Sequence, residues 1–343
     1  DVYKRQGLNN IPLPPAFRAE VEKDLRLPVH RSLYRLQKPT ILVFTWPNGE
    51  TRHFVFTQNG ILLEKNDFWL KYFPFIKREE NFFRLSGVVS ESGLIQTNNS
   101  FVWCPDMANF THFLVDAFSP YISLFTNLGA SNKFAIPQFS RMPSWQNEFF
   151  HNLGERKLFQ GAVGSFLLFE PNELFFPVIS GTLERLIHVS AYFKSISVSK
   201  ASQSGKIRPI FLTRHDERSA RIRNSEEIAR YVMKKGGLCI DPSKLGIRKK
   251  RELFSMDAIF LCEGSGNTNV SVFGSNNSRV ICLLDATAIA DPAFIQGGWP
   301  YFHATSNRTD FICGTDCMKL IGSPLNSCNY NLRNIEEIIQ RYC

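Results

Sequence analysis

The sequence predicts an α/β protein with two domains, of which the second is built on a doubly wound parallel sheet. Two observations lead to this prediction. In the C-terminal half, short apolar runs typical of buried strands alternate with helical patterns through short connections. In the N-terminal half, alternating strand patterns and hairpin turn signals dominate, so we expect additional strands there.

A change in composition along the chain sets the predicted domain boundaries. Residues 1–6 resemble a translated sequencing adapter and are expected to be an artefact. We predict an N-terminal domain over residues 7–194 and an exposed Ser/Lys/Gly-rich linker over 195–206. The C-terminal domain covers 207–330, and a C-terminal helix follows over 331–343.

The composition is that of a globular protein. With 343 residues, of which 43% are hydrophobic, the chain can bury a sizeable core and is long enough for two domains of about 150 residues each. No window approaches the roughly 18 consecutive apolar residues of a membrane helix, and the start lacks a basic-then-apolar secretory signal.

Cysteine usage and charge bear on location and partners. The eight cysteines contain no CxxC pair, and three of them (Cys239, Cys262 and Cys282) fall inside predicted buried strands, which favours reduced thiols and a cytoplasmic protein. The net charge of +9 suits phosphorylated ligands, nucleic acid or peripheral contact with an anionic membrane surface. Because no zinc-finger, recognition-helix or RNA-binding signature is present, we expect no nucleic-acid partner.

The elements of the N-terminal domain follow from proline content, alternation and helical spacing. Residues 7–40 are proline-rich and irregular, which indicates an extended arm. Short alternating segments over 41–103 flank turn signals and predict hairpins. A helix is expected over Asn109–Phe118, with Pro120 as its stop, and another over Leu183–Phe193.

The C-terminal domain follows a βαβ pattern. Helices are expected over Ser225–Lys235, which Asn224 caps and Gly236-Gly237 ends, and over Arg248–Ser255. The predicted strands are Arg208–Thr213, Leu238–Ile240, Asp257–Cys262 and Arg279–Leu284. Because doubly wound sheets bind ligands beyond the carboxyl ends of their strands, we expect the functional residues at that edge.

A glycine turn after the third of these strands predicts an anion site. Gly264 and Gly266 tolerate positive φ and close backbone approach, and small polar residues then lead into an apolar helix start at Val270. The free N–H groups and the dipole of a helix start attract an anion such as phosphate. Arg214, directly after the first strand, is expected to converge on the same crevice. The alternatives are a plain tight turn and, for Arg214, a surface charge.

Four pieces of the chain resemble, in order and spacing, the successive motifs of glycosyltransferase family 61. They are Asn109–Asp116, Ile210–Arg214, Arg221–Glu227 and Ser255–Phe273. The family includes capsular-polysaccharide biosynthesis transferases, plant xylan and arabinan transferases and protein O-GlcNAc-type transferases. The resemblance implies a GT-B architecture, in which two Rossmann-like domains face a cleft.

The resemblance also implies an activity and a set of site residues. The activity is an inverting transfer of a hexose or pentose from a nucleotide-diphosphate sugar, held by the C-terminal half, to a glycan hydroxyl held by the N-terminal half. No cofactor and no obligatory metal are implied, and no Asp-x-Asp follows a strand in a suitable loop. The donor-binding residues are then Arg214, Arg221, Asn224, Glu263, Gly264, Ser265, Gly266, Thr268 and Asn269.

The chain departs from the family pattern at two places. Many members carry Pro-His-Gly where this chain has Cys262-Glu263-Gly264, and Asn-Glu where it has Asn224-Ser225. A carboxylate beside a diphosphate repels it unless the carboxylate bonds a sugar or ribose hydroxyl, so Glu263 bears on donor identity. Asn224, Thr268 and Asn269 are also explained as helix caps, and Arg221 as part of a solvated basic run.

His112 is the candidate catalytic base. It lies beside the apolar stripe of its helix, where a lone histidine is more often structural than catalytic. Asp116 is four residues later on the same face, close enough to orient the imidazole. We predict that His112 removes the proton of the acceptor hydroxyl during direct displacement at the anomeric carbon, while positive groups stabilise the departing diphosphate.

Two alternatives from other functional classes remain open at this point. One is a non-catalytic carbohydrate-binding or nucleotide-binding protein on the GT-B fold. The other is a nicotinamide-dependent oxidoreductase, although its glycine fingerprint should open the first βα unit of the domain, whereas here the glycines follow the third strand.

Overall fold

The computed structural model divides the chain into two compact units, which are described separately. We call His30–Ser180 the N-terminal unit and Gly181–Cys343 the C-terminal unit. The structure describes residues 31–46, 51–63, 76–80, 83–86, 92–105, 107, 110–128, 134–140, 143–150, 154–160, 162–179, 182–195, 207–213, 221–263, 265–275, 277–285, 308–319 and 326–342.

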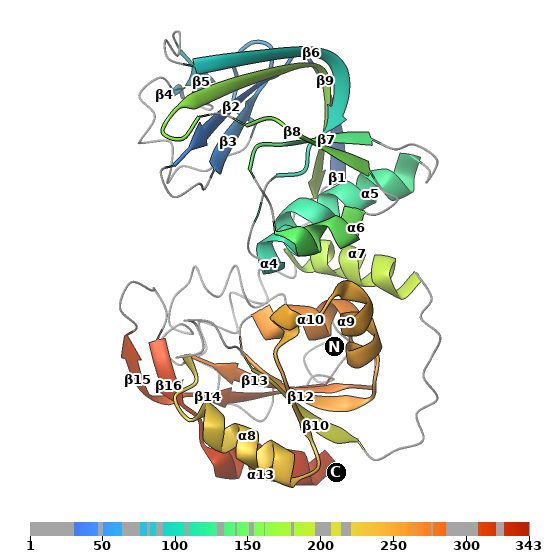
Figure 1. Cartoon of the computed structure of the whole chain (residues 1–343), viewed down its shortest axis with the longest axis vertical. Helices are drawn as coiled ribbons and strands as arrows, with labels where there is room; N and C mark the ends of the chain where they lie inside the picture. The colour runs from blue at the N-terminus through green and yellow to red at the C-terminus, as the bar shows by residue number, and fades with distance from the viewer. Residues whose placement is uncertain are drawn as a thin grey trace. The chain divides into compact units, whose positions relative to one another are not determined.

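The N-terminal unit is organised around a mixed sheet (Figure 1). In spatial order its strands are β3 (Thr51–Phe56), β2 (Thr40–Thr45), β9 (Phe166–Ile179), β6 (Ser92–Val102), β7 (Phe134–Gln138) and β8 (Gly154–Leu158). The pairs from β9 through β6 and β7 to β8 are parallel, whereas β2 pairs antiparallel with β3 and with β9. A register shift between Thr97 and Ser100 interrupts the β6 and β9 pairing, and bulges of this kind bend a strand.

The first strand of the N-terminal unit corrects one expectation. Residues 7–40 were expected to be irregular, but β1 (Arg31–Gln37) pairs antiparallel with β9. The side chains of Arg35 and Gln37 both bond the carboxylate of Glu173 on β9. The pairing therefore depends on a partner that is far away in sequence, and no local pattern reveals it. Residues 7–30 lie outside the described part of the chain.

The expected helix of the N-terminal unit is present, but it does not end at Pro120. Helix α4 (Phe110–His112), a π-helical turn η2 (Phe113–Phe118) and helix α5 (Ser119–Leu128) follow one another without a break. The Ser119 N–H bonds the Leu114 carbonyl, one residue further back than in an α-helix. Because this wider turn lies directly before Pro120, it accommodates a ring that would otherwise crowd the preceding turn.

The remaining short elements of the N-terminal unit are a hairpin and a helical segment. Strands β4 (Ile76–Arg78) and β5 (Phe83–Leu85) form the hairpin. A 3-10 turn (Ser144–Gln146) leads into α6 (Asn147–Phe150), whose Phe149 and Phe150 are buried against the aromatic face of η2. Among the helices of the described residues, none has the length and apolar character that crossing a membrane requires.

The C-terminal unit contains the doubly wound parallel sheet that the sequence predicts (Figure 1). Its strands, in spatial order, are β11 (Leu238–Ile240), β10 (Arg208–Leu212), β12 (Ala258–Cys262), β13 (Arg279–Leu284) and β14 (Arg308–Cys313). All neighbouring pairs are parallel. The first strand along the chain therefore lies between the second and the third, which places the reversal of strand order between β10 and β12.

Helices cover both faces of this sheet (Figure 1). On one face, α8 (Ser225–Lys234) and α13 (Leu332–Tyr342) bury isoleucine and valine side chains against β10, β12 and β13. On the other face lie α9 (Ile247–Phe254) and α10 (Ser265–Phe273), whose Phe254 and Phe273 stack together. Phe193 of α7 (Thr182–Ser195) packs on Phe273, so α7 belongs with the C-terminal unit, although the sequence placed it in the N-terminal domain.

The ends of two helices test the predicted signals in detail. Gly236 ends α8 with a φ of 74°, and the N–H groups of Gly236 and Gly237 bond the carbonyls of Met233 and Val232, as a Schellman motif requires. Helix α10 begins at Ser265, not at Val270 as expected. The four predicted strands of this unit are thus confirmed, as are the helix at 225–235 with its Gly236-Gly237 end and the helix expected at 248–255, but the predicted start of α10 at Val270 was wrong.

The cysteines differ from expectation at one place. Cys239, Cys262 and Cys282 are free thiols, as predicted. Cys317 on β15 (Thr315–Lys319) and Cys328 on β16 (Asn326–Asn329), however, are joined by a disulfide. The antiparallel pairing of these two short strands brings the cysteines together, and their spacing in the sequence does not reveal it.

Candidate functional site

The candidate donor site lies at the carboxyl ends of β10 and β12. The two strands pair in parallel register, with Phe211 opposite Leu261, so their carboxyl ends lie at the same edge of the sheet. This edge is the position at which doubly wound sheets bind ligands, because the strand order reverses here. Arg214 and Gly264, which were predicted to contact the ligand at this edge, lie outside the described residues.

Arg221 and Glu263 form an ion pair at this edge. Nη1 of Arg221 donates to Oε1 of Glu263 over 3.1 Å, and the two side chains are 14% and 16% exposed. Within the described part of the chain, the buried Nε of Arg221 has no hydrogen-bond partner. The structure thus brings together two residues that the sequence assigned to the donor site. It also shows a buried guanidinium N–H that has no acceptor among the described residues.

The backbone of β16 holds the segment that carries Arg221. Ile222 forms a parallel bridge with Cys328, and the Arg223 N–H bonds the Cys328 carbonyl at 2.9 Å. Asn224 bonds the Tyr330 backbone in both directions, at 2.8 and 3.0 Å. Asn224 stands at the cap position of α8, but its side chain makes no capping bond. The expected cap is therefore an anchor between the Arg221 segment and the end of β16.

The start of α10 is packed tightly under this edge. A Cβ on Gly266 would lie 2.9 Å from the Cβ of Cys262, so Gly266 allows the close approach of helix and strand. Asn267 bonds the thiol sulfurs of Cys262 and Cys282, at 2.8 and 3.2 Å. The sequence does not single out Asn267, because its partners lie on two strands.

Thr268 and Asn269 are buried, with 1% and 4% of their surface exposed. They lie inside α10 and not before it, so their predicted role as caps of a helix starting at Val270 is not supported by the helix bounds. The side chain of Ser265 lies outside the described part of the chain. Burial raises the pKa values of Cys262 and Cys282 well above the ordinary range, so both remain neutral thiols and neither serves as a nucleophile.

The candidate base lies in the N-terminal unit. Nδ1 of His112 lies 2.9 Å from Oδ2 of Asp116, and the His112 side chain is 61% exposed. The neighbouring apolar residues of η2 are buried, which turns the two polar side chains away from the core. The hydrogen bond to Asp116 raises the pKa of His112, against a smaller opposing effect of burial. The predicted pairing of these two residues is confirmed.

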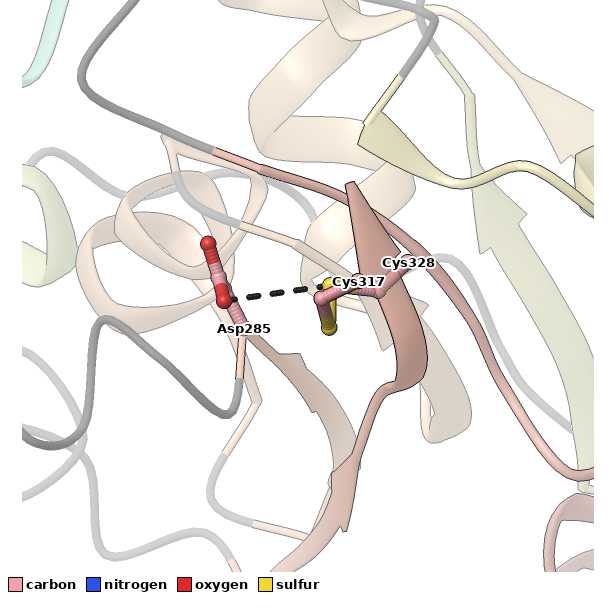
Figure 2. Close-up of side chains that lie close together, drawn as sticks. All are labelled: Asp285, Cys317 and Cys328. Carbon is pink, nitrogen blue, oxygen red and sulfur yellow. Dashed lines mark hydrogen bonds between the residues drawn. A yellow bond between two sulfur atoms is a disulfide. The ribbon is translucent and has the colours of Figure 1, made fainter. Parts of the chain in front are cut away.

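One group of side chains among the described residues has the composition of a metal site. One ligand atom each from Asp285, Cys317 and Cys328 lies within 4.8 Å of the others, and Figure 2 shows the three side chains converging. Asp285 directly follows β13, whereas the cysteines come from the β15 and β16 hairpin. In this structure the two sulfurs are joined as a disulfide. No pattern in the sequence predicts this cluster.

Comparison with known proteins adds one match. The model of the family described as glycosyltransferase 61 matches residues 110–281, which is half of the chain. The match includes His112 and Asp116 in the N-terminal unit and Arg221 and Glu263 in the C-terminal unit. No curated protein sequence matches the chain.

Proposed function

The chain belongs to the glycosyltransferase 61 family, and from this premise we propose that it is an inverting glycosyltransferase that uses a nucleotide-diphosphate sugar. Membership supports a transferase with a sugar donor and an acceptor. The nature of the donor, the stereochemical outcome and the roles of individual residues are the parts that we propose. The acceptor is a hydroxyl of a glycan, as in polysaccharide or glycoconjugate synthesis.

The proposed binding of the nucleotide sugar rests on one observation, the unsatisfied Nε–H of Arg221. Its Nε–H is buried without a partner among the described residues, and a buried unpaired N–H is unfavourable by about 1–3 kcal/mol. A phosphate oxygen would satisfy this N–H while Nη1 keeps its bond to Glu263. The α10 N-terminus at the same strand edge adds positive potential.

Glu263 fits this proposal as a contact to a hydroxyl. A free carboxylate would repel a diphosphate, but the charge of Glu263 is balanced by Arg221. Its remaining lone pairs can accept hydrogen bonds from a ribose or sugar hydroxyl. We therefore assign phosphate binding to Arg221, with Arg214 as a second cation, and assign hydroxyl binding to Glu263.

His112 is proposed as the base on the acceptor side. Because Nδ1 bonds Asp116, Nε2 of the neutral ring is left to accept a proton. In the reaction, the acceptor oxygen forms a bond to the anomeric carbon as the bond from that carbon to the diphosphate oxygen breaks. The hydroxyl proton goes to Nε2 of His112, and the leaving diphosphate keeps the bonding electron pair. The GT-B arrangement of the two units is part of this proposal.

A non-catalytic binding protein is the second candidate. The replacement of the family's usual histidine by Glu263, already paired with Arg221, favours this alternative, because it puts a negative charge at the donor edge. The two candidates differ in turnover and not in ligand class. A protein that binds a nucleotide sugar without transferring or hydrolysing it would support the alternative.

A panel of nucleotides and nucleotide sugars in a thermal-shift assay tests the proposal first. A ligand at 100 times its Kd stabilises the native state by about 2.7 kcal/mol, which is a measurable shift. Transfer from the donor so identified is then assayed with and without EDTA. We expect transfer to survive the chelator, since Arg221, Arg214 and the α10 N-terminus are assigned the charge stabilisation. Complete loss with EDTA and rescue by Mn²⁺ or Mg²⁺ would contradict the metal-independent mechanism.

A further inference from the structure

The disulfide hairpin and the end of β13 form a cluster outside the proposed reaction site. Cys317 and Cys328 come from the hairpin, and Asp285 approaches them from the adjoining sheet (Figure 2). The Sγ of Cys328 lies 3.8 Å from Oδ1 of Asp285. Cys328 is fully buried, whereas Cys317 and Asp285 are partly buried.

The donor set of this cluster matches the preference of one metal. Two thiolates and a carboxylate are ligands that Zn²⁺ binds at about 2.3 and 2.0 Å, so sulfur and oxygen ligands of a tetrahedral ion lie about 3.5 Å apart. The separation of 3.8 Å between Cys328 and Asp285 is close to this value. Once the disulfide is reduced, the sulfurs need to separate from bonding distance to about 3.8 Å, and the partly buried Cys317 leaves room for this movement.

The Asp285 carboxylate is also held in place, as metal ligands usually are. The backbone N–H of Asn326 donates to its Oδ2 at 3.0 Å, and Nδ2 of Asn326 donates to both oxygens at 3.3 and 3.0 Å. Such second contacts fix the orientation of a ligating carboxylate. Because Asn326 begins β16, the same strand supplies the thiol of Cys328 and the group that orients Asp285.

We propose that Asp285, Cys317 and Cys328 form a redox-controlled zinc site. A dithiol reductant transfers two electrons and two protons to the disulfide, breaks the bond between the sulfurs and becomes a disulfide itself. Zn²⁺ then displaces the two thiol protons and binds both sulfurs and one oxygen of Asp285, with water as the fourth ligand. In the reverse direction a small-molecule disulfide takes two electrons from the two thiolates and two protons from water and becomes a dithiol. This step releases the metal and restores the bond between Cys317 and Cys328. The hairpin is thus cross-linked in two states, by the disulfide or by zinc, and is not cross-linked in the third state, which is reduced and free of metal.

The two cross-linked states have a common structural consequence. The Cys328 carbonyl accepts the Arg223 N–H, and Cys328 bridges Ile222, so a fixed β16 also fixes the segment next to Arg221. Reduction without metal removes the link, and zinc replaces it. We therefore expect Zn²⁺ to restore the thermal stability that is lost on reduction. This inference does not depend on the proposed sugar transfer.

Zinc titration of the whole chain tests the proposal. The protein is reduced with a phosphine, freed of the reductant without air, and titrated with Zn²⁺ against a chromophoric chelator. We expect one ion per chain in the reduced protein and none at this site in the oxidised protein. Cys317→Ser and Asp285→Asn should each weaken binding at least ~100-fold. Cys239→Ser is the matched control, because Cys239 is a free thiol on β11, at the opposite edge of the sheet; it should bind as the wild type does.

A measurement on the unchanged protein covers the case in which a variant does not fold. Reduced protein is alkylated with and without Zn²⁺, and labelling is mapped by mass spectrometry. Zinc should protect Cys317 but not Cys313, which is an exposed free thiol. Equal labelling of Cys317 with and without zinc, or zinc binding that is the same in the oxidised protein, would overturn the proposal.

Discussion

The guanidinium of Arg221 and the carboxylate of Glu263 meet over 3.1 Å at the end of β12, where both side chains are mostly buried. The two residues are 42 positions apart in the sequence. Each was predicted to contact a donor, but neither was predicted to contact the other. Their pairing offsets the charges of these two side chains before a ligand arrives, and this changes what each substitution should do.

Arg221→Ala should weaken the binding of a nucleoside diphosphate by about 1.5–3 kcal/mol, the scale of a charge-assisted hydrogen bond. The physical reason is the loss of the guanidinium that we assign to phosphate. Arg223→Ala is the matched control, because Arg223 lies in the same segment but is exposed and donates to the Asp316 carbonyl. Calorimetry that finds equal affinities for both variants and the wild type would remove Arg221 from the site.

Glu263→Gln should strengthen the binding of the same nucleoside diphosphate. The substitution keeps an acceptor for Arg221 but removes a negative charge near the phosphates, and with it a like-charge repulsion on the order of 1–2 kcal/mol. The gain should shrink as salt is added, since screening weakens the repulsion in the wild type. If affinity instead falls at every ionic strength, the carboxylate itself contributes to binding, and the hydroxyl contact outweighs the repulsion.

The third prediction concerns the packing of α10 on the sheet. Gly266→Ala places a Cβ 2.9 Å from the Cβ of Cys262 and 3.6 Å from the side chain of Leu212. The helix must shift, and such overpacking typically lowers the free energy of unfolding by about 1–3 kcal/mol. Gly93→Ala on β6 is the control, because its nearest contact would be an ordinary 3.6 Å. Urea unfolding of both variants gives the comparison, and equal stabilities would show that α10 has room for a methyl group.

Of all the elements of the fold, the sequence predicts the buried parallel strands best. Strands such as β12 and β13 are buried on both faces, so each is a continuous apolar run whose ends are marked by polar residues. The start of α10 could not be read in the same way. Asn267 and its polar neighbours look like a loop, but they are buried and make their contacts inside the protein.

The candidate site was predictable where the signal is local and not where partners are distant in sequence. The spacing of His112 and Asp116 is a local signal, and their contact was predicted correctly. Asn224 is anchored by Tyr330, which lies 106 positions away in the sequence. The sequence therefore predicted only a local role for Asn224, as a helix cap. The disulfide between Cys317 and Cys328 likewise depends on strand pairing that includes an irregular register.

His53 on β3 should make the protein sensitive to acid. Its Nδ1 is buried, and burial together with the nearby charge of Arg52 lowers the pKa of His53 from 6.5 to about 4. Between pH 6.5 and 4, His53 is protonated in the unfolded chain but neutral in the native protein. The free energy of unfolding therefore decreases as the pH falls from about 6.5 to 4, by up to ~3 kcal/mol. Above pH 6.5 this residue contributes no pH dependence.

The matched variant for this prediction is His53→Phe, which keeps an aromatic ring beside Trp103. In the wild type the ring centroids of His53 and Trp103 are 5.0 Å apart. Unfolding free energies of both proteins are measured across pH 4 to 8. The difference between them should be constant above pH 7 and should change below pH 6.5. A constant difference over the whole range would show that His53 is protonated in the native state as readily as in the unfolded chain.

The last prediction tests His112 as the base, through the pH dependence of transfer. Asp116 raises the pKa of His112 above its ordinary 6.5. Because a base acts in its neutral form, the rate should rise with pH and level off above an inflection that lies higher than 6.5. Asp116→Asn removes the charge that favours the protonated ring, so the inflection should move to lower pH while the plateau falls modestly. A merely structural Asp116 would lower the rate without moving the inflection.

His112→Ala should lower transfer on the order of 10²–10⁴-fold, the usual contribution of a general base. Donor affinity and melting temperature should stay near their wild-type values, because the side chain is largely exposed and lies in the unit that does not carry the donor residues. The three quantities are measured on the same preparation. A folded variant that binds the donor and transfers at nearly the normal rate would exclude His112 as the base. A variant whose rate falls only in step with its stability would make His112 a structural residue, since the loss of activity would then follow the loss of the fold.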